Sequence, residues 1–223
     1  MALALFDLDN TLLAGDSDYL WGCFLVEQGI VDRQLHESKN KKFYDDYARG
    51  TLDIQAYLDF QLAVLARFDL PALEKWRAQY VAEMIEPIIA PKTEELLQFH
   101  RARRDVLIII TATNRFVTAP IARLLRVDHL LATEIESVNE RFTGRPKGIP
   151  CFKEGKIKHL ERWMAEHRAT LSGSWFYSDS LNDIPLLEKV DHPRVVDPDA
   201  HFRAMAEKRG WPTISLRNNG SLD

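Results

Sequence analysis

The sequence predicts an α/β fold in which a parallel β-sheet carries helices on both faces and receives a helical insert near its start. Three observations predict it. A short apolar run at 3–8 opens the chain, the next seventy residues carry apolar side chains only at helical spacing, and strand-like and helix-like segments then alternate to the end. Such alternation is typical of a parallel sheet. The expected core therefore comprises 1–15 and 87–223, and the expected insert comprises 16–86.

The insert is predicted to be a bundle of helices. Four stretches in it carry apolar residues every three or four positions, as an amphipathic helix does. Gly29, Gly50 and Pro71 fall at the breaks between these stretches, where helices end or begin. The insert contains no stretch with the alternation of a β-strand.

The second part of the core begins with a clear strand. The run VLIIIT at 106–111 is continuous and β-branched, which is typical of a strand buried on both faces. A helix is expected near 115–126, followed by a strand and a hairpin with a polar turn about Asn139. The later expected elements are a helix in GKIKHLERWMAEH, a strand in SWFYSD, a helix in LNDIPLLEKV, a strand in RVVD, a helix in DAHFRAMAEKRG and a strand in TISL.

Composition narrows the class of protein. The net charge is −4 and no basic stripe is present, so we expect no nucleic-acid partner. No segment approaches the roughly 20 apolar residues of a membrane span, and the opening run is interrupted by Asp7 and lacks a basic leader, unlike a signal peptide. Cys23 and Cys151 have no spacing typical of a disulfide framework or a zinc site. These features favour a cytoplasmic protein.

Polar residues follow three of the predicted strands. In open parallel sheets, ligands bind beyond the carboxyl ends of the strands. The run at 3–8 is predicted to be the first buried strand, which would place Asp7 and Asp9 on one face because residues i and i+2 point the same way. The residues that we expect at this edge are Asp7, Asp9 and Thr11 at the end of this strand, Thr111 at the end of the second, and Asp179 and Asp183 after SWFYS. Their convergence predicts a functional site.

The residue types at this edge favour phosphoryl transfer. Clustered carboxylates need a compensating cation, and an all-oxygen set suits Mg²⁺. An aspartate next to such a cation can act as a nucleophile, and Asp9, two residues after Asp7, can reach a leaving group as a general acid. The Thr111 hydroxyl and nearby backbone N–H groups would bind phosphoryl oxygens, and a lysine would complete the site.

Three motifs resemble those of the haloacid dehalogenase superfamily. They are DLDNT at 7–11, IIIT at 108–111 and DSLND at 179–183, in the order of that family. The insert lies at the position of the family's C1 cap, and YSDSLNDIPLLE and PCFKEGKIKHL resemble the subfamily that contains phosphoserine phosphatase. The resemblance covers essentially the whole chain and implies a Rossmann-like core with a C1-type helical cap.

The resemblance also implies roles for the acidic residues. Asp7 would be the nucleophile that becomes phosphorylated and a ligand of Mg²⁺. Asp9 would act as general acid and then base, and would bind the metal through its backbone carbonyl. Asp179 would be the third protein ligand, with Asp183 supporting the metal site.

Phosphate binding in the resembling family uses a threonine or serine and a lysine. Thr111, with the adjacent backbone at Ala112, would bind the phosphoryl oxygens. Among Lys153, Lys156 and Lys158, the spacing after PC favours Lys156, with Lys158 as the alternative. Asn182 matches an asparagine that contacts substrate in phosphoserine phosphatases.

The substrate is open between several small phosphorylated metabolites. Asp16 falls where phosphoserine phosphatases carry a glutamate that binds the substrate amino group, although capping a helix explains it nearly as well. Those enzymes also bind the substrate carboxylate through an arginine, and neither Arg49 nor Arg67 has the matching spacing. TATNR also replaces the usual Ser-Gly-Gly of the second motif. Phosphoserine and histidinol phosphate are both candidates.

Two other functions fit the same motifs. A phosphotransferase would use the same aspartyl-phosphate and a different acceptor. A binding module without turnover would keep the fold, but the complete set of Asp7, Asp9, Thr111, Asp179 and a lysine argues against that alternative. The sequence makes no prediction about the oligomeric state.

Overall fold

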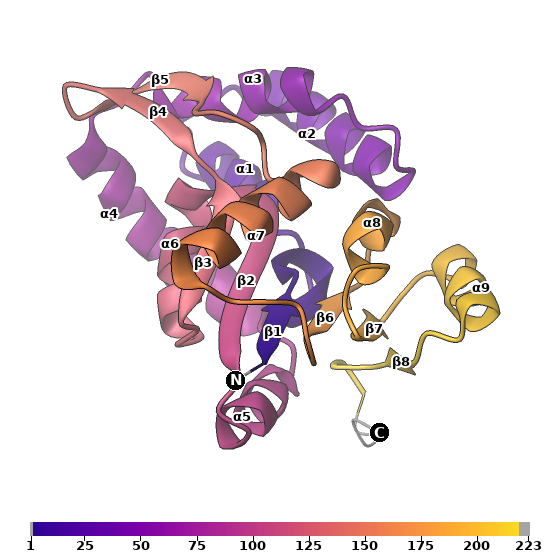
Figure 1. Ribbon diagram of the computed structural model, residues 1–223. Coiled ribbons are helices and arrows are strands. Elements are labelled where there is room, and N and C mark those ends of the chain that lie inside the picture. Colours follow the sequence, from indigo (N-terminus) through magenta and orange to yellow (C-terminus); the bar gives the residue numbers. More distant parts are fainter. Residues whose placement is uncertain (1, 219–223) are drawn as a thin grey trace.

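The computed structural model describes residues 2–218 of the chain. Six parallel strands form one sheet in the order β3-β2-β1-β6-β7-β8 (Figure 1). They span Leu3–Phe6 (β1), Val106–Asn114 (β2), His129–Thr133 (β3), Trp175–Ser178 (β6), His192–Val196 (β7) and Thr213–Ile214 (β8). The predicted α/β fold with a parallel sheet is confirmed.

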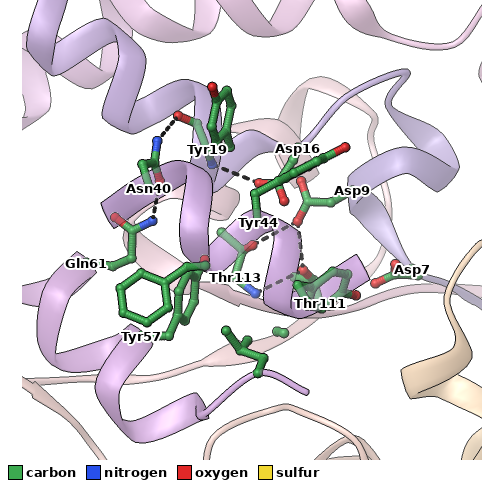
Figure 2. A pocket seen from close by; sticks show the side chains of 14 residues that line it. Asp7, Asp9, Asp16, Tyr19, Asn40, Tyr44, Tyr57, Gln61, Thr111 and Thr113 are labelled. Atoms are coloured by element: carbon green, nitrogen blue, oxygen red, sulfur yellow. Dashed lines mark hydrogen bonds between the residues drawn. The ribbon is translucent and has the colours of Figure 1, made fainter. Parts of the chain in front are cut away.

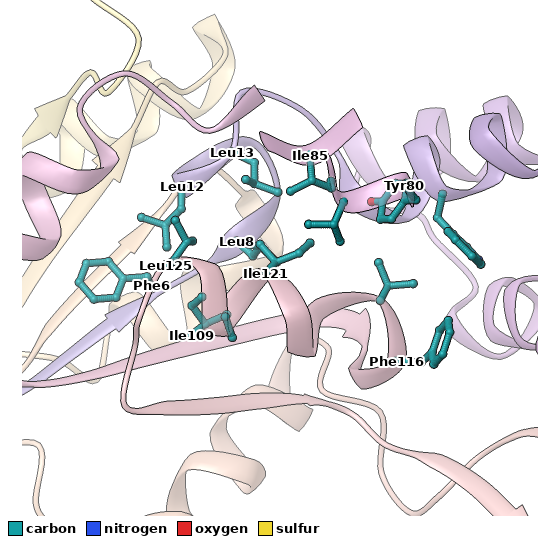
Figure 3. Close-up of a cluster of buried hydrophobic side chains, with 14 of the residues drawn as sticks. Phe6, Leu8, Leu12, Leu13, Tyr80, Ile85, Ile109, Phe116, Ile121 and Leu125 are labelled. Carbon is teal, nitrogen blue, oxygen red and sulfur yellow. The ribbon is translucent and has the colours of Figure 1, made fainter. Parts of the chain in front are cut away.

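Helices cover both faces of this sheet. They are α5 (Thr93–Ala102), α6 (Arg115–Leu124), α7 (Glu154–His167), α8 (Ile184–Leu187) and α9 (Ala200–Arg209). Successive residues of a strand point to opposite faces, and the buried side chains of β1 and β2 divide accordingly. Phe6 and Ile109 pack on one side with Ile121 of α6, as Figure 3 shows, whereas Leu5 and Ile110 pack on the other side with helices α7, α8 and α9.

The segment after β1 forms the predicted helices. They are α1 (Ser17–Glu27), α2 (Arg33–Ala48), α3 (Ile54–Leu65) and α4 (Leu70–Tyr80), followed by single turns at Val81–Ile85 and Glu86–Ile88. Each of the four helices begins after an aspartate whose side chain accepts a backbone N–H of the first turn, namely Asp16, Asp32, Asp53 and Asp69. This capping contributes about 1 kcal/mol per helix and explains where each helix starts.

A two-stranded hairpin joins the core to these helices. It consists of β4 (Ile135–Val138) and β5 (Arg141–Pro146) and turns at Asn139, as predicted. Asn139 and Glu140 in the turn have positive φ angles. Figure 1 shows the hairpin beside α3. Gly144 has a φ of 81°, and a Cβ there would lie 3.2 Å from Ala66 Cβ. The hairpin therefore packs closely on α3.

Several element boundaries differ from the sequence prediction, and β2 continues past the expected end at Thr111 to Asn114. The first strand was expected to extend to Leu8 but ends at Phe6, because the chain then makes a tight turn over Leu8–Leu12 with Asn10 at a φ of 57°. Asp7 and Asp9 therefore do not share one face of a strand. The expected helix in LNDIPLLEKV is divided into a single turn at Leu181–Asp183 and the short α8. Within residues 2–218, no helix combines the length and the apolar character needed to span a membrane.

Candidate active site

A pocket lies between the carboxyl edge of the sheet and the helices of the insert (Figure 2). Its floor is formed by residues that follow β1 and by residues near the end of β2. The lining residues are Asp7, Asp9, Asp16, Tyr19, Asn40, Phe43, Tyr44, Tyr47, Leu52, Tyr57, Gln61, Thr111, Ala112 and Thr113. Five of the predicted site residues, Asp7, Asp9, Asp16, Thr111 and Ala112, thus lie around one cavity.

Asp7 is held in place from two sides. Its backbone N–H donates to the carbonyl of Tyr177 in β6 over 2.9 Å, and its Oδ1 accepts a hydrogen bond from Lys156 Nζ over 2.8 Å. Burial raises the pKa of Asp7 well above its usual value, and the Lys156 ammonium only partly offsets this. Asp7 Oδ2 is buried and has no hydrogen-bond partner among the described residues. That oxygen is free to bond to a ligand.

Lys156 connects Asp7 to Asp183. Its Nζ lies 2.8 Å from Asp183 Oδ2 as well as from Asp7 Oδ1, and its side chain is 1% exposed. Although burial alone would lower the pKa of Lys156, the Asp183 and Asp7 carboxylates raise it above the usual value. Ser178 Oγ also donates to Asp183 Oδ2 over 2.7 Å. Lys158, by contrast, is exposed and lines a different surface groove.

Asp9 faces the pocket from the turn that follows β1. Its Oδ1 accepts the backbone N–H of Ser17 over 2.6 Å, and its Oδ2 accepts a hydrogen bond from Thr113 Oγ1 over 2.8 Å. Burial raises the pKa of Asp9, and the hydrogen bonds from Ser17 and Thr113 oppose that rise. A raised pKa favours the protonated acid, which is the form that a general acid needs. Thr113 was not among the predicted site residues.

Asp179, which follows β6, contacts the turn that follows β1. Its Oδ1 accepts a hydrogen bond from Thr11 Oγ1 over 3.0 Å, and its backbone N–H donates back to the same oxygen over 3.1 Å. Burial raises the pKa of Asp179 to about 7, and the nearby Asp183 contributes to the rise. Asp179 lines a groove that shares Tyr44 and Tyr47 with the pocket.

The carboxylates carry more negative charge than Lys156 can balance. Asp183 Oδ1, like Asp7 Oδ2, is a buried oxygen without a hydrogen-bond partner among the described residues. Unpaired buried acceptors of this kind are costly, and a bound cation would satisfy them. Within residues 2–218, no three His, Cys, Asp or Glu side chains are grouped as an all-protein metal cage requires. This arrangement fits Mg²⁺, which binds through one or two carboxylates and takes its other ligands from water and phosphate.

Asn182 lies outside the pocket, although we expected it to contact substrate. Its side-chain nitrogen donates to the backbone carbonyl of Tyr47 and to Ser180 Oγ, each over 3.2 Å. Lys153 Nζ donates in the same way to the carbonyl of Gly50 over 3.0 Å. Both contacts fix the end of α2 to the core.

We did not predict from the sequence that the insert forms a wall of the pocket, although the spacing of residues in α2 indicates it. Asn40, Phe43, Tyr44 and Tyr47 all line the pocket and occupy positions i, i+3, i+4 and i+7 of α2. That spacing places residues on one face of a helix. A polar and aromatic face of this kind on an otherwise exposed helix could have been recognised.

Asp16 caps a helix, as expected, and also lies in the pocket wall, where a role in binding an amino group stays a prediction. Its Oδ1 accepts the backbone N–H of Tyr19 and so caps α1, and the residue also lines the pocket. Burial raises its pKa well above the usual value, and Asp9 adds to the effect. Arg49 is exposed and paired with Asp46, and Arg67 lines another surface depression. Neither arginine lines the pocket.

A comparison with sequence models of known families identifies the family of this chain. A sequence model of the haloacid dehalogenase-like hydrolases matches residues 4–188, which include all three motifs. The chain belongs to the haloacid dehalogenase-like hydrolase family. It is an enzyme of the hydrolase type, as membership of this family implies.

Two other proteins are similar to this chain over nearly its whole length. A protein named histidinol-phosphatase from Neisseria meningitidis serogroup C (strain 8013) is 42% identical over 219 residues, which cover 96% of this chain and 99% of the relative. A crystal structure of a protein of unknown function from Bordetella pertussis Tohama I superposes with a TM-score of 0.90 at 40% identity, covering 96% of this chain and 98% of the other.

The resemblance to phosphoserine phosphatase extends to the fold. A substrate-bound phosphoserine phosphatase superposes with a TM-score of 0.72 and 17% identity, covering 97% of this chain and 94% of the other. At this identity, the match concerns the fold alone. It agrees with the predicted Rossmann-like core and helical insert of this hydrolase family.

Proposed function

We propose that this hydrolase is a Mg²⁺-dependent phosphomonoesterase that acts through a phosphorylated Asp7. The observation that carries the proposal is the hydrogen bonding of the two Asp7 carboxyl oxygens in the floor of the pocket. One of its oxygens is held by Lys156 Nζ at 2.8 Å, and the other is buried without a hydrogen-bond partner among the described residues. An oriented, partly neutralised carboxylate with a free oxygen is suited to attack a phosphorus atom.

In the first step, an Asp7 oxygen bonds to phosphorus and the ester oxygen leaves with the electrons of its bond. Asp9 gives its proton to that oxygen, so the product is a neutral alcohol. Burial of Asp9 keeps the proton available, and its contacts with Ser17 and Thr113 fix the direction of the carboxyl group. Thr111 and the backbone at Ala112 line the pocket and would bind the phosphoryl oxygens.

In the second step, water attacks the phosphorus of the phosphorylated Asp7. Asp9, now ionised, takes a proton from that water, the bond between Asp7 and phosphorus breaks, and inorganic phosphate is released. Lys156 balances charge on Asp7 in both steps. The cycle returns both aspartates to their starting protonation states.

Mg²⁺ would be held by Asp7, by the backbone carbonyl of Asp9 and by Asp179, with Asp183 supporting them. Such a cation neutralises phosphoryl and carboxylate charge when bound. The buried Oδ1 of Asp183, which has no hydrogen-bond partner among the described residues, is the observation that favours it.

Between the two candidate substrates, the pocket favours histidinol phosphate over phosphoserine. No lysine or arginine is among the described residues that line it, so nothing there would pair with the carboxylate of phosphoserine. Asp16 offers a carboxyl group to an ammonium, and five aromatic side chains line the walls. Histidinol phosphate has an ammonium group and a flat ring but no carboxylate. The name of the Neisseria relative agrees with this choice.

The test is phosphate release from a panel of phosphomonoesters, with Mg²⁺ and with EDTA. The panel contains histidinol phosphate, phosphoserine, sugar phosphates, nucleotides and an aryl phosphate. We expect Mg²⁺-dependent turnover that is fastest on histidinol phosphate. Turnover that persists in EDTA would contradict the requirement for Mg²⁺. A phosphotransferase would give a different result, because the substrate would release its alcohol without inorganic phosphate while a second alcohol became phosphorylated. The absence of turnover on every ester would overturn the proposal.

A further inference from the structure

Gln61 of α3 lies at the opposite end of the pocket from Asp7 (Figure 2). The residue is 3% exposed. Its Oε1 atom is buried, and none of the residues in 2–218 donates a hydrogen bond to it. A buried acceptor without a donor destabilises the protein unless a ligand supplies the missing partner. The catalytic steps described above do not use this oxygen.

A chain of hydrogen bonds determines which end of the Gln61 amide is free. Asn40 Nδ2 donates to the backbone carbonyl of Tyr19 over 2.9 Å, and because that carbonyl can only accept, the nitrogen of Asn40 must face it. Asn40 Oδ1 then faces Gln61 and accepts from Gln61 Nε2 over 3.3 Å. The amide nitrogen of Gln61 is thereby committed, and its oxygen remains as the free acceptor.

The surroundings of Gln61 define the kind of group that would meet this acceptor. Phe43 and Tyr57 line the same pocket, with ring centroids 5.6 Å apart in an edge-on arrangement. Tyr57 OH donates to the buried Asp18 carboxyl group, so it is engaged there. Flat apolar walls and a lone acceptor suit a ring that carries an N–H group.

We propose that Gln61 determines substrate specificity by accepting a hydrogen bond from an N–H donor at the end of the substrate farthest from the phosphate. The inference rests on the proposed phosphatase function and adds a chemical class to it, namely phosphomonoesters of amino alcohols with an N–H-bearing heteroaromatic ring. Asn40 acts as a positioning residue because it holds the Gln61 amide in the required direction. A carboxylate at that end of the substrate would face the Gln61 oxygen and be repelled.

The experiment compares two substrates that differ at the ring alone. Histidinol phosphate has a ring N–H, whereas the phosphate ester of phenylalaninol keeps the ammonium group, the chain and a flat ring but has no ring donor. We measure kcat/KM for both with the wild-type chain, with Gln61→Met and with Gln55→Met. Gln55 is a matched control because it lies on the same helix, is exposed and is bonded to Asp59.

We expect the wild-type ratio of kcat/KM, histidinol phosphate over phenylalaninol phosphate, to fall about tenfold in Gln61→Met, the usual effect of one lost buried hydrogen bond. The change should appear mainly in KM, since the contact is remote from the reacting phosphorus and is made in the ground state as well. Gln55→Met should keep the wild-type ratio. Gln61→Glu, which keeps an acceptor oxygen, should retain more of the preference than Gln61→Met.

An unchanged ratio in a folded Gln61→Met variant would overturn the inference, and so would an equal loss on both substrates, which would indicate a structural role. Failure of the proposed function gives a different result, since the wild-type chain would then hydrolyse neither ester. In that event, calorimetric binding of histidinol and of phenylalaninol tests the contact without turnover. Stronger binding of histidinol that Gln61→Met removes would support the role of Gln61, and equal binding of the two alcohols would refute it.

Discussion

The ammonium group of Lys156 lies 2.8 Å from Asp7 Oδ1, with both side chains almost fully buried. The two residues are 149 positions apart in the chain. Lys156 lies in the first turn of α7 and Asp7 directly follows β1, so their contact joins two separate elements of the core. The same ammonium group contacts Asp183. Lys156 is thus the positive centre of a largely negative site.

Replacement of Lys156 by Met should reduce both stability and activity. The substitution leaves two buried carboxylates, Asp7 and Asp183, without their cation, and loss of one partner of a buried ion pair typically costs about 3–5 kcal/mol. We expect a corresponding decrease in the free energy of unfolding, measured by urea titration without Mg²⁺. Phosphate release should fall as well, because Asp7 loses its orientation. Lys158→Met is the matched control, since Lys158 is exposed, and equal effects of the two changes would contradict the assignment.

Replacement of Asp7 by Asn should abolish hydrolysis and leave the fold intact. The amide cannot form the phosphorylated intermediate, so kcat should fall by roughly 10⁴-fold or more, as for other nucleophiles removed from active sites. Burial already disfavours the charged form of Asp7, so the melting temperature should not decrease. Circular dichroism and phosphate release measure the two effects. Near-normal turnover by a folded Asp7→Asn variant would show that another group is the nucleophile.

Replacement of Asp9 by Asn should separate the two chemical steps. Without a proton donor, formation of the phosphorylated Asp7 is slow, and without a base its hydrolysis is lost. The phosphorylated protein should therefore accumulate and be detectable by intact-mass spectrometry after incubation with substrate. Asp59→Asn, an exposed position on α3, serves as a control for the loss of one carboxylate. Normal turnover by Asp9→Asn would exclude the acid and base role.

A buried histidine that does not line the pocket should make the stability of the fold sensitive to acid. His100 of α5 contacts Asp105 Oδ2 and Tyr177 OH through its two ring nitrogens, each at 2.9 Å. Burial lowers the pKa of His100, and the Asp105 carboxylate only partly opposes this. The folded protein therefore keeps the ring neutral at a pH where the unfolded chain, with a pKa of about 6.5, takes up a proton.

Stability should consequently decrease as the pH falls through about 6.5, because the unfolded state then binds more protons than the folded state. Above that pH, the neutral His100 makes its full contribution to the free energy of unfolding. Below it, this single group lowers the free energy of unfolding by at most about 1.4 kcal/mol per pH unit. Free energies of unfolding between about pH 7.5 and 5.5 should show this slope in the wild-type chain and a smaller one in His100→Gln. Parallel curves for the two proteins would exclude His100 as the source.

Much of this protein follows from local patterns in its sequence. The helices of the insert, the buried β2 and the hairpin about Asn139 are set by apolar periodicity, caps and turn residues, all of which act over a few positions. The carboxyl-edge residues could be predicted as a group because every strand of a parallel sheet ends at the same edge. The error at the end of β1 has a physical reason. Asp7 and Asp9 alternate with apolar residues as a strand would, but Asn10 permits a tight turn.

The sequence by itself therefore determined the fold class, the motif residues and the kind of chemistry that they can perform. The spacing after PC favoured Lys156 over Lys158, but only the tertiary structure shows which of the two is buried against Asp7, since they lie on different faces of α7. The same holds for the free oxygen of Gln61, which depends on contacts with Asn40 and Tyr19 from two other helices. Contacts between distant segments arise when helices pack, and no local spacing encodes them.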